Sequence, residues 1–547
     1  MAVLYRKLKN TNLFKDFENE DKLNVCGAQN YIPIYNRFFE LNATNWQNVS
    51  LYHLKTLVSV QEKKEKEKEN IFLASLVDDN QKEETAPVFF KYSPLLDPNK
   101  YMTGAYSLEE ALPSWGDTSA NKKLLDENNS AYTDSFFYYL SSRLKHQGFE
   151  HGIDFYGSYL GYKKDFKYFL DEDAECICND TFFKKNLGHV FTTNVQVRGK
   201  LKKLDLGEEC SITADCLIES DFVLVEDDGQ VKEFKEAKEV AVEEVVGVAE
   251  DEDEKEKEKE KEKEDVHEED KSISTNSSRS SNSSDGTTES YHGSESTDES
   301  RSYDGVDDAY AIIAKYPVQI IAIEACEDTL DSLLDKISPE ELASCLCQVV
   351  MSLILYQKVY QFTHNDLHTN NIMYVHTDKP FLYYSVNDTA YKVPTFGKIF
   401  KIIDFGRSIY TFQEKRFMSD SFSSNGDAST QYNCEPYFNP LKPLLEPNYS
   451  FDLCRLACSM IDMMPEKDEY EELNQLLDDW CSDDKGRNVV YKRNGEERYP
   501  GFKLYKMIAR TVHNNTPLLQ LRRPIFQKYI VKKKALKNVS VMNLDSF

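Results

Sequence analysis

The stretch from Thr363 to Gly406 holds the side chains best suited to chemistry. Asp366 and Asn371 are five residues apart in THNDLHTNN, and Asp404 follows the apolar run KIFKII. We expect the runs NIMYV and IFKIID to form adjacent antiparallel strands, which would bring these three residues to one edge. A carboxylate and an amide oxygen are hard ligands that suit Mg²⁺ held together with substrate phosphates. A further carboxylate nearby can orient a hydroxyl group and accept its proton.

Several predicted elements must position these residues. The run PEELASCLCQVVMSLILYQKVYQF predicts a long helix with Pro339 in its first turn. Residues 54–92 predict three strands, 130–147 predict a helix, and VQIIAIEA predicts a buried strand. From about Tyr449 onwards the chain is predicted to be mostly helical. Strands first and helices later indicate an α+β protein with two unlike lobes.

Two of these motifs resemble those of protein kinases. HNDLHTNN is similar to the kinase catalytic loop HRDLKxxN, and IIDFG resembles the metal-binding DFG motif. The resemblance implies a bilobal kinase-like fold that uses ATP, with Asp366 as the catalytic base. It further implies that Asn371 and Asp404 bind Mg²⁺ and that His364 is a structural residue of the loop.

Other segments match kinase motifs in the same order along the chain. VFFK resembles the third-strand VAIK motif, which implies that Lys91 contacts the nucleotide phosphates and that Asp134 pairs with it. IIAIEAC resembles the strand and hinge that meet adenine, which implies contacts around Glu324 to Cys326. YSFDLCRLACSM resembles the start of the large helix of the second lobe, with Asp452 bracing the catalytic loop. The whole set is most similar to the atypical Ser/Thr kinase-like proteins of large DNA viruses.

Three of these assignments have structural alternatives. Lys91 could be a solvated lysine that protects an edge strand from aggregation. Asp134 could be a solvated acid in the first turn of its helix, where the helix dipole favours negative charge. Asp452 could cap the N-terminus of its own helix.

The sequence also departs from the kinase pattern. EKKEKEKEN at 62–70 stands where a glycine-rich loop should contact phosphates, and we expect a strand–turn–strand with a charged tip there. His368 replaces the loop lysine, where it would either contact the γ-phosphate or hydrogen-bond within the loop. The 38-residue spacing from Asp366 to Asp404 predicts an extra hairpin between the two strands. No APE motif follows, and CEPYFNP is the nearest match to it.

A further departure bears on regulation. Asn365 replaces the arginine that, in many kinases, pairs with a phosphate on the activation segment. We therefore expect the segment after Gly406 to be held by packing of its aromatic residues rather than by phosphorylation. The candidate residues are Phe412, Phe417, Phe422 and Tyr432.

Charge and composition define the domain organisation. The 547 residues carry 94 acids and 66 bases, and this net charge of −28 argues against nucleic acid as the main partner. The Lys/Glu-rich and Ser-rich stretch 226–302 is predicted to be a disordered insertion, because it has too little apolar surface to offset ordering entropy. The expected domains are an N-terminal extension (1–50), a kinase-like N-lobe in two parts (51–225 and 303–325) and a kinase-like C-lobe (326–547).

The cysteines and the apolar runs indicate the compartment. Twelve cysteines are scattered without a CxxC pair, so we expect reduced thiols in the core rather than a zinc site. The amino-terminal sequence lacks a signal peptide, and no apolar run approaches the ~20 residues that cross a membrane. We expect a soluble protein of the host cytoplasm or the virion that is neither secreted nor membrane-bound.

Three functions are compatible with these observations. The favoured function is an atypical Ser/Thr kinase that transfers the γ-phosphate of ATP to an unidentified protein substrate. A pseudokinase scaffold is an alternative because the glycine-rich loop is missing. A phosphotransferase for a small hydroxylated molecule is another, because the loop has the form DLHxxN and the APE motif is absent. The sequence leaves the oligomeric state open.

Overall fold

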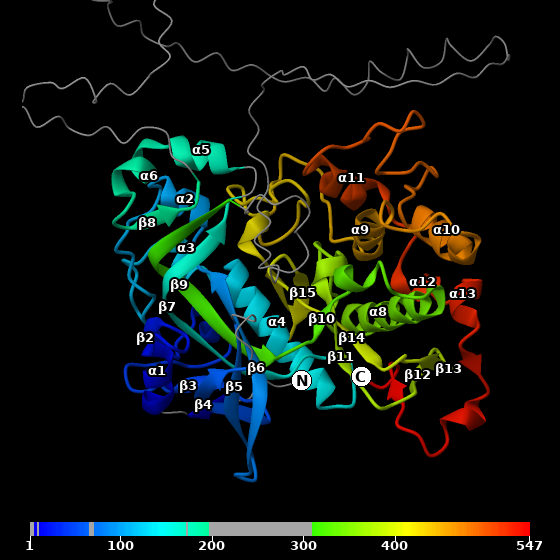
Figure 1. Cartoon of the computed structure of the whole chain (residues 1–547), viewed down its shortest axis with the longest axis horizontal. Helices are drawn as coiled ribbons and strands as arrows, with labels where there is room; N and C mark the ends of the chain where they lie inside the picture. The colour runs from blue at the N-terminus through cyan, green and yellow to red at the C-terminus, as the bar shows by residue number, and fades with distance from the viewer. Residues whose placement is uncertain (1–4, 8–9, 65–69, 171–172, 196–308) are drawn as a thin grey trace, which may run out of the picture. The chain divides into compact units, whose positions relative to one another are not determined.

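A curled, mainly antiparallel sheet dominates the amino-terminal part of the chain (Figure 1). The computed structural model describes residues 5–7, 10–64, 70–170, 173–195 and 309–547. The strands follow the order β2–β7–β9–β6–β5–β4, and β8 pairs with β9. They are β2 (Val25–Gln29), β4 (Lys55–Lys63), β5 (Ile71–Asp78), β6 (Glu83–Pro94), β7 (Phe155–Phe169), β8 (Phe191–Thr193) and β9 (Tyr310–Glu324).

The strands predicted from residues 54–92 are present as β4, β5 and β6, which pair antiparallel in sequence order. The tip of the β4–β5 hairpin, 65–69, lies outside the described residues, as does the predicted insertion 226–302. β9 is a central strand, and its run from Tyr316 to Ile323 is fully buried because other elements cover both faces of the sheet.

The expected N-terminal extension (1–50) contributes one strand, β2, to this sheet. β2 pairs with β7, and α1 (Thr11–Glu18) packs against β4 through the buried side chains of Leu13 and Phe17. The sequence gives little sign of this, because β2 is short and a bulge interrupts its pairing. Small elements complete this part of the chain: β1 (Tyr5–Lys7), β3 (Val49–Leu51), α2 (Pro98–Met102), α3 (Lys122–Leu125), α5 (Ala174–Asn179) and α6 (Thr181–Asn186).

The helix α4 (Ser130–Lys145) lies between the curled sheet and α8 (Figure 1). The Asn129 side chain caps it by accepting a hydrogen bond from the Ala131 amide. Most of its residues are buried, because one face packs on β7 and β9 while Phe137 packs on Tyr356 of α8. A helix buried on all sides has a weak amphipathic pattern but a precisely fixed position, and it can therefore hold functional side chains.

The helix α8 (Pro339–Tyr360) begins and ends at sequence signals that specify helix termini. Ser338 caps it, Pro339 occupies its first turn, and Gln361 ends it in a left-handed conformation with a φ of 51°. The helix is long and apolar enough to cross a membrane, but 83% of its most apolar window is buried inside the protein. It therefore serves as a core helix of the carboxy-terminal part.

The two strands predicted after α8 are β11 (Ile372–His376) and β14 (Lys398–Ile402), which pair antiparallel beside the short β10 (Asp328–Thr329). The extra hairpin predicted between them is also present, as β12 (Phe381–Val386) and β13 (Thr389–Pro394). Two strands near the carboxy terminus, β17 (Ile530–Val531) and β18 (Met542–Asn543), pair with this hairpin. The hairpin thus holds the carboxy-terminal end of the chain by pairing with two of its strands.

The remainder is less helical than expected. After the hairpin of β15 (Ile409–Phe412) and β16 (Lys415–Met418), the helices are short and joined by turns. They are α9 (Phe451–Met460), α10 (Glu471–Trp480), α11 (Lys503–Thr511), α12 (Pro517–Gln520) and α13 (Pro524–Gln527). Prolines start the last two helices, and glycines with positive φ at Gly486, Gly495 and Gly501 interrupt the chain between α10 and α11.

Candidate functional site

Lys91 is the centre of the first group of candidate residues. It lies on β6, and its Nζ contacts Asp134 Oδ2 at 2.8 Å and Asp404 Oδ1 at 2.9 Å. The expected pair of Lys91 and Asp134 is therefore present, and it is not solvated: the Asp134 side chain is 1% exposed. Lys91 thus bridges the sheet, the helix α4 and the segment that follows β14.

The helix α4 holds this segment through two side chains one turn apart. Asp134 Oδ1 accepts a hydrogen bond from the Phe405 amide at 2.8 Å, and Tyr138 Oη accepts one from the Asp404 amide at 2.9 Å. Residues at positions i and i+4 share one face of a helix, so a single face of α4 fixes two successive peptide groups. The Lys91 ammonium also lies 5.6 Å from the centre of the Tyr138 ring.

The backbone at Asp404 has an uncommon conformation. Its φ is +62°, a left-handed value that aspartate tolerates better than most residues do. The next residue, Phe405, is fully buried, and its ring lies 4.6 Å from Phe137 and 4.8 Å from Tyr138. Packing of this ring and the two α4 hydrogen bonds stabilise the conformation that directs the Asp404 carboxylate towards Lys91.

The opposite charges in this group shift the pKa values of Lys91 and Asp404. Burial alone would lower the pKa of Lys91, but the carboxylates of Asp134 and Asp404 outweigh it and raise that pKa well above its usual value. Burial would likewise raise the pKa of Asp404, yet the ammonium of Lys91 holds it below the ordinary value. The lysine is therefore a cation and Asp404 an anion at neutral pH.

Asp366 belongs to a loop whose backbone is held by hydrogen bonds to the side chain of Asp452. The Asp452 carboxylate accepts hydrogen bonds from the backbone amides of His364 and Asn365, both at 2.9 Å. The buried His364 ring spans the loop, since Nε2 donates to the Ile403 carbonyl at 2.8 Å and Nδ1 accepts from the Asp366 amide at 3.3 Å. Asp452 therefore braces the loop, as expected, and is not limited to capping α9.

The amide of Asn371 is oriented by its neighbours. Its Nδ2 lies 2.9 Å from the Asp366 carbonyl and 3.1 Å from His368 Nε2, so the amide oxygen points away from these two acceptors. The Asn371 carbonyl accepts from the Ile403 amide at 3.0 Å, which places this residue beside Asp404 at the end of the paired strands β11 and β14. The predicted juxtaposition at one edge is thus present.

These two residues offer oxygen ligands of the kind that Mg²⁺ uses. Lys91 contacts one carboxylate oxygen of Asp404, while no described residue donates a hydrogen bond to the other oxygen or to Asn371 Oδ1. No cluster of three or more His, Cys, Asp or Glu side chains suited to a metal occurs in the described ranges. A site with one carboxylate and one amide suits Mg²⁺, which keeps water and substrate phosphates as its remaining ligands.

His368 takes the second of its two expected roles. Its ring is buried and hydrogen-bonds the Asn371 amide, and this burial lowers its pKa to about 4. The imidazole is therefore neutral at pH 7 and orients Asn371 within the loop. It offers no positive charge to a phosphate at that pH, in contrast to the lysine expected at this position of a kinase-like loop.

Glu324 and Cys326 lie at the end of β9, where the hinge was expected. The Glu324 carboxylate is bound by Lys145 at 2.7 Å and by the buried Lys401 at 2.8 Å, so it serves an ion cluster rather than a ligand. The Cys326 thiol is buried, and this burial raises its pKa to about 12, which makes it an unreactive thiol.

Two residues at the site lack a motif that would identify them. Tyr138 follows Asp134 by four residues, so helical spacing alone could have marked it. Tyr505 Oη donates a hydrogen bond to Asp366 Oδ1 at 2.8 Å from a position 139 residues later in the chain. On the other side of this carboxylate, Arg407 Nη1 lies 3.9 Å from Oδ2.

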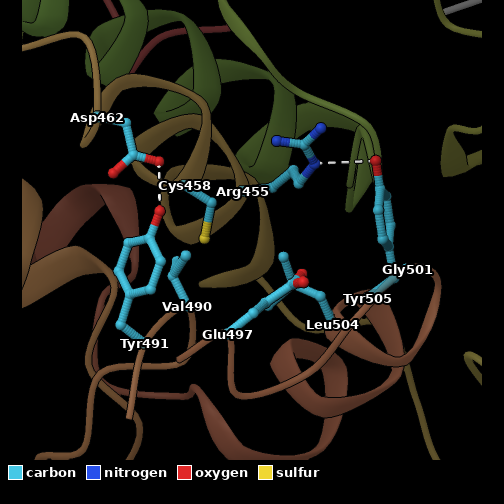
Figure 2. Close-up of a pocket in the computed structure, with 9 residues that line it drawn as sticks. All are labelled: Arg455, Cys458, Asp462, Val490, Tyr491, Glu497, Gly501, Leu504 and Tyr505. Carbon is cyan, nitrogen blue, oxygen red and sulfur yellow. Dashed lines mark hydrogen bonds between the residues drawn. The ribbon is translucent and has the colours of Figure 1, made fainter. Parts of the chain in front are cut away.

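Tyr505, whose hydroxyl contacts Asp366, also lines a cavity of about 390 Å³ (Figure 2). Figure 2 shows polar groups from several segments around it, with Tyr491 hydrogen-bonded to Asp462. The lining residues are Arg455, Cys458, Asp462, Val490, Tyr491, Glu497, Gly501, Leu504 and Tyr505.

In comparisons with known proteins, no protein-family model matches this chain and no curated protein matches it.

Proposed function

We propose that this protein is an atypical ATP-dependent phosphotransferase, a Ser/Thr protein kinase with a kinase-like bilobal fold. The curled sheet with α4 would be its first lobe, and the part that contains α8 and α9 would be its second. The observation that carries the proposal is the contact of Lys91 with both Asp134 and Asp404. It joins residues from three distant segments at one point, and the segments of Lys91 and Asp404 each resemble a kinase motif.

Each charged residue has a role in the proposed reaction. Lys91, held by Asp134, would bind the phosphates of ATP, while Asn371 and Asp404 would hold Mg²⁺. The bound metal would neutralise charge on the transferred phosphate. Asp366 would orient the acceptor hydroxyl and take its proton as the acceptor oxygen bonds to the γ-phosphorus. The bond from that phosphorus to the β–γ bridging oxygen breaks, and ADP leaves with the electron pair.

The surroundings of Asp366 are compatible with this role. The hydrogen bond from Tyr505 holds one oxygen of the Asp366 carboxylate, the group that would take the proton of a substrate hydroxyl. Asp452 and His364 fix the loop from the buried side, which supports the geometry that proton transfer requires. The complete set of charged groups favours an active enzyme over the pseudokinase alternative.

The cavity beside Tyr505 favours a second candidate acceptor, a small hydroxylated molecule. Its volume of about 390 Å³ lies within the range that holds small ligands, roughly 300–1,000 Å³. Its lining offers the charged side chains of Arg455 and Glu497 to a polar molecule. The acceptor in this case would enter through the cavity and reach Asp366 past Tyr505.

One assay tests the proposal and separates the two acceptors. The protein is incubated with Mg²⁺ and ATP labelled in the γ-phosphate, with generic protein substrates or with mixed polyols and sugars. Label in acid-precipitable protein supports the kinase, and label in a new acid-soluble ester supports the small-molecule enzyme. The absence of Mg²⁺-dependent ATP binding and of transfer to any acceptor would overturn both.

The variant Asp404→Asn connects the activity to the site. Asparagine tolerates the left-handed backbone at this position but lacks the negative charge that Lys91 and Mg²⁺ require. We expect loss of Mg²⁺-dependent ATP binding and transfer. Asp388→Asn is the matched control, since Asp388 is an exposed residue with a φ of 62° in the turn between β12 and β13. Equal activity of the two variants would contradict the assignment.

A further inference from the structure

Tyr505 connects a carboxy-terminal helix to the proposed base. It lies on α11, is 6% exposed, and its hydroxyl donates a hydrogen bond to Asp366 Oδ1 at 2.8 Å. Its ring is held by stacking on Phe502, with ring centres 5.3 Å apart, and by a tilted contact with Phe451 at 6.0 Å. The hydroxyl therefore has little freedom to move away from the carboxylate.

Arg455 fixes the direction of this hydrogen bond. Its Nε donates to the Tyr505 hydroxyl at 2.9 Å, as drawn in Figure 2. A guanidinium group can only donate, so the tyrosine oxygen accepts from Arg455 and its own proton is left for Asp366. The three side chains thus form one directed chain from α9 through α11 to the catalytic loop.

The protonation state of Tyr505 suits a permanent donor. Burial, together with the charge of Asp366, raises its pKa to about 12 even though Arg455 and Arg407 oppose this effect. The phenol consequently keeps its proton throughout the physiological pH range. His368, the loop's own imidazole, is committed to Asn371, so this donor reaches Asp366 from outside the loop.

We propose that Tyr505, oriented by Arg455, is a positioning residue that keeps the Asp366 carboxylate aimed at the acceptor hydroxyl. A hydrogen bond to a carboxylate restricts its rotation. This inference rests on the proposed function of Asp366 and identifies α11 as a part of the active site. A purely structural Tyr505 would instead stabilise the fold without changing kcat.

The cavity provides a matched control for this proposal. Tyr491 lines the same cavity, and its hydroxyl donates to the carboxylate of Asp462 at 2.6 Å. Replacement of either tyrosine by phenylalanine removes one hydroxyl and one hydrogen bond to a carboxylate. Of these two tyrosines, only Tyr505 donates its hydrogen bond to Asp366.

The first experiment compares Tyr505→Phe with Tyr491→Phe in the full chain. We expect Tyr505→Phe to lower kcat about tenfold, because it removes a hydrogen bond to a charged group, while the KM for ATP stays within about twofold. Tyr491→Phe should change neither quantity.

Two results of this comparison would overturn the proposal. An unchanged kcat in Tyr505→Phe would show that the hydroxyl does not act on Asp366. An increase in kcat would show that Tyr505 blocks the acceptor's place rather than positioning the base. Thermal melts of both variants confirm that each one is folded before the rates are compared.

A second experiment tests the contact without any turnover. 3-Fluorotyrosine is incorporated at position 505, and its ¹⁹F resonance is followed as the pH is raised. We expect the phenol to titrate about one unit lower in the Asp366→Asn background, because the negative charge that raises its pKa is gone. Identical titrations would refute the contact. If the chain transfers no phosphate at all, the proposed function fails, and this titration still decides whether Tyr505 acts on Asp366.

Discussion

Asp134 and Tyr138 are one turn apart on α4 and accept hydrogen bonds from the successive amides of Phe405 and Asp404. Asp134 also accepts the hydrogen bond from Lys91, so its two oxygens connect β6 to the segment after β14. Any displacement of α4 would therefore separate Lys91 from Asp404 and release the backbone of the latter. The position of one helix thus decides whether the charged group is assembled.

Tyr138→Phe tests this relationship. The variant removes the acceptor for the Asp404 amide, and we expect a loss of about 1 kcal/mol in the free energy of unfolding. Weaker Mg²⁺-ATP binding should accompany this loss, because Asp404 is no longer held in its left-handed conformation. Isothermal titration with ATP and urea unfolding measure the two effects.

The matched control is Tyr132→Phe on the same helix. Tyr132 is also fully buried, and its hydroxyl donates to the Leu124 carbonyl at 2.8 Å, away from Lys91 and Asp404. We expect a similar loss of stability and unchanged ATP affinity. If both variants bind ATP equally well, the α4 contact with Asp404 has no role in the site.

Asp366→Asn should abolish transfer but preserve nucleotide binding. The amide can still accept a hydrogen bond from Tyr505 and from an acceptor hydroxyl, but it cannot take a proton. The loss of a general base typically lowers the rate ~10²–10⁴-fold. Rates of transfer and the affinity for Mg²⁺-ATP are measured in parallel, with Asp388→Asn as the control. Turnover close to that of the unaltered protein would show that another group serves as the base.

Buried histidines predict a loss of stability in acid. His151 is fully buried between the Phe400 carbonyl and the Tyr384 hydroxyl, and this burial lowers its pKa to about 4. The ordinary pKa of a histidine is 6.5, so between pH 6.5 and 4 the unfolded chain binds more protons than the folded one. The free energy of unfolding therefore falls as the pH drops through this window, by roughly 2 kcal/mol for His151 by pH 5.

Urea unfolding at pH 8 and at pH 5 measures this effect. His151→Gln should lower stability at pH 8 but lose about 2 kcal/mol less than the unaltered protein between the two values. The exposed His189 provides the control, because His189→Gln should leave the pH dependence as it is. Equal pH dependence in all three proteins would show that His151 does not remain neutral in the folded chain.

Most elements that position the site could be predicted from the sequence. The caps and apolar spacing of α4 and α8 act locally, so the sequence specifies these helices directly. Two short apolar runs predicted the pairing of β11 with β14. The insertion between these runs was itself predicted to be a hairpin, as the structure shows. The role of residues 1–50 was missed, since a short bulged strand such as β2 carries little pattern.

The candidate site could be predicted only where residue types recur at fixed spacing. Asp366 and Asn371 share one loop, and Lys91 and Asp134 lie on neighbouring elements, so motifs locate them. Tyr505 shares no local pattern with Asp366, and its contact depends on how α11 packs on α9.

Deletion of 230–300 should leave folding and activity nearly unchanged. The described chain on either side of this region converges, because β8 pairs with β9 and the Asn194 amide lies 3.4 Å from the Tyr310 carbonyl. A shorter connection between neighbouring strands changes the closure entropy by about 1 kcal/mol or less. A cooperative melt and an unchanged rate of phosphate transfer are expected, whereas aggregation of the deletion variant would show that these residues contribute to the fold.

The last prediction concerns the segment after Gly406. The aromatic residues expected to hold it are buried: Phe412, Phe417, Phe422 and Tyr432. The Tyr432 hydroxyl donates to Asn365 Oδ1 at 2.7 Å, and Asn365 Nδ2 donates to the Arg407 carbonyl at 3.0 Å. The residue that replaces the usual arginine therefore ties the segment to the catalytic loop through neutral hydrogen bonds.

Because these bonds and the packing already order the segment, phosphorylation should add little. Ser419 is fully buried, while Ser424 and Thr430 are exposed and could accept phosphate. We expect initial rates after phosphatase treatment and after preincubation with Mg²⁺-ATP to agree within about twofold, because no new charge-assisted pair is needed to order the loop. Tyr432→Phe should lower the rate in both states, since it removes the bond to Asn365. An activation of tenfold or more that maps to Ser424 or Thr430 would mean that a basic residue such as Arg407 or Arg416 has taken over the missing arginine's role.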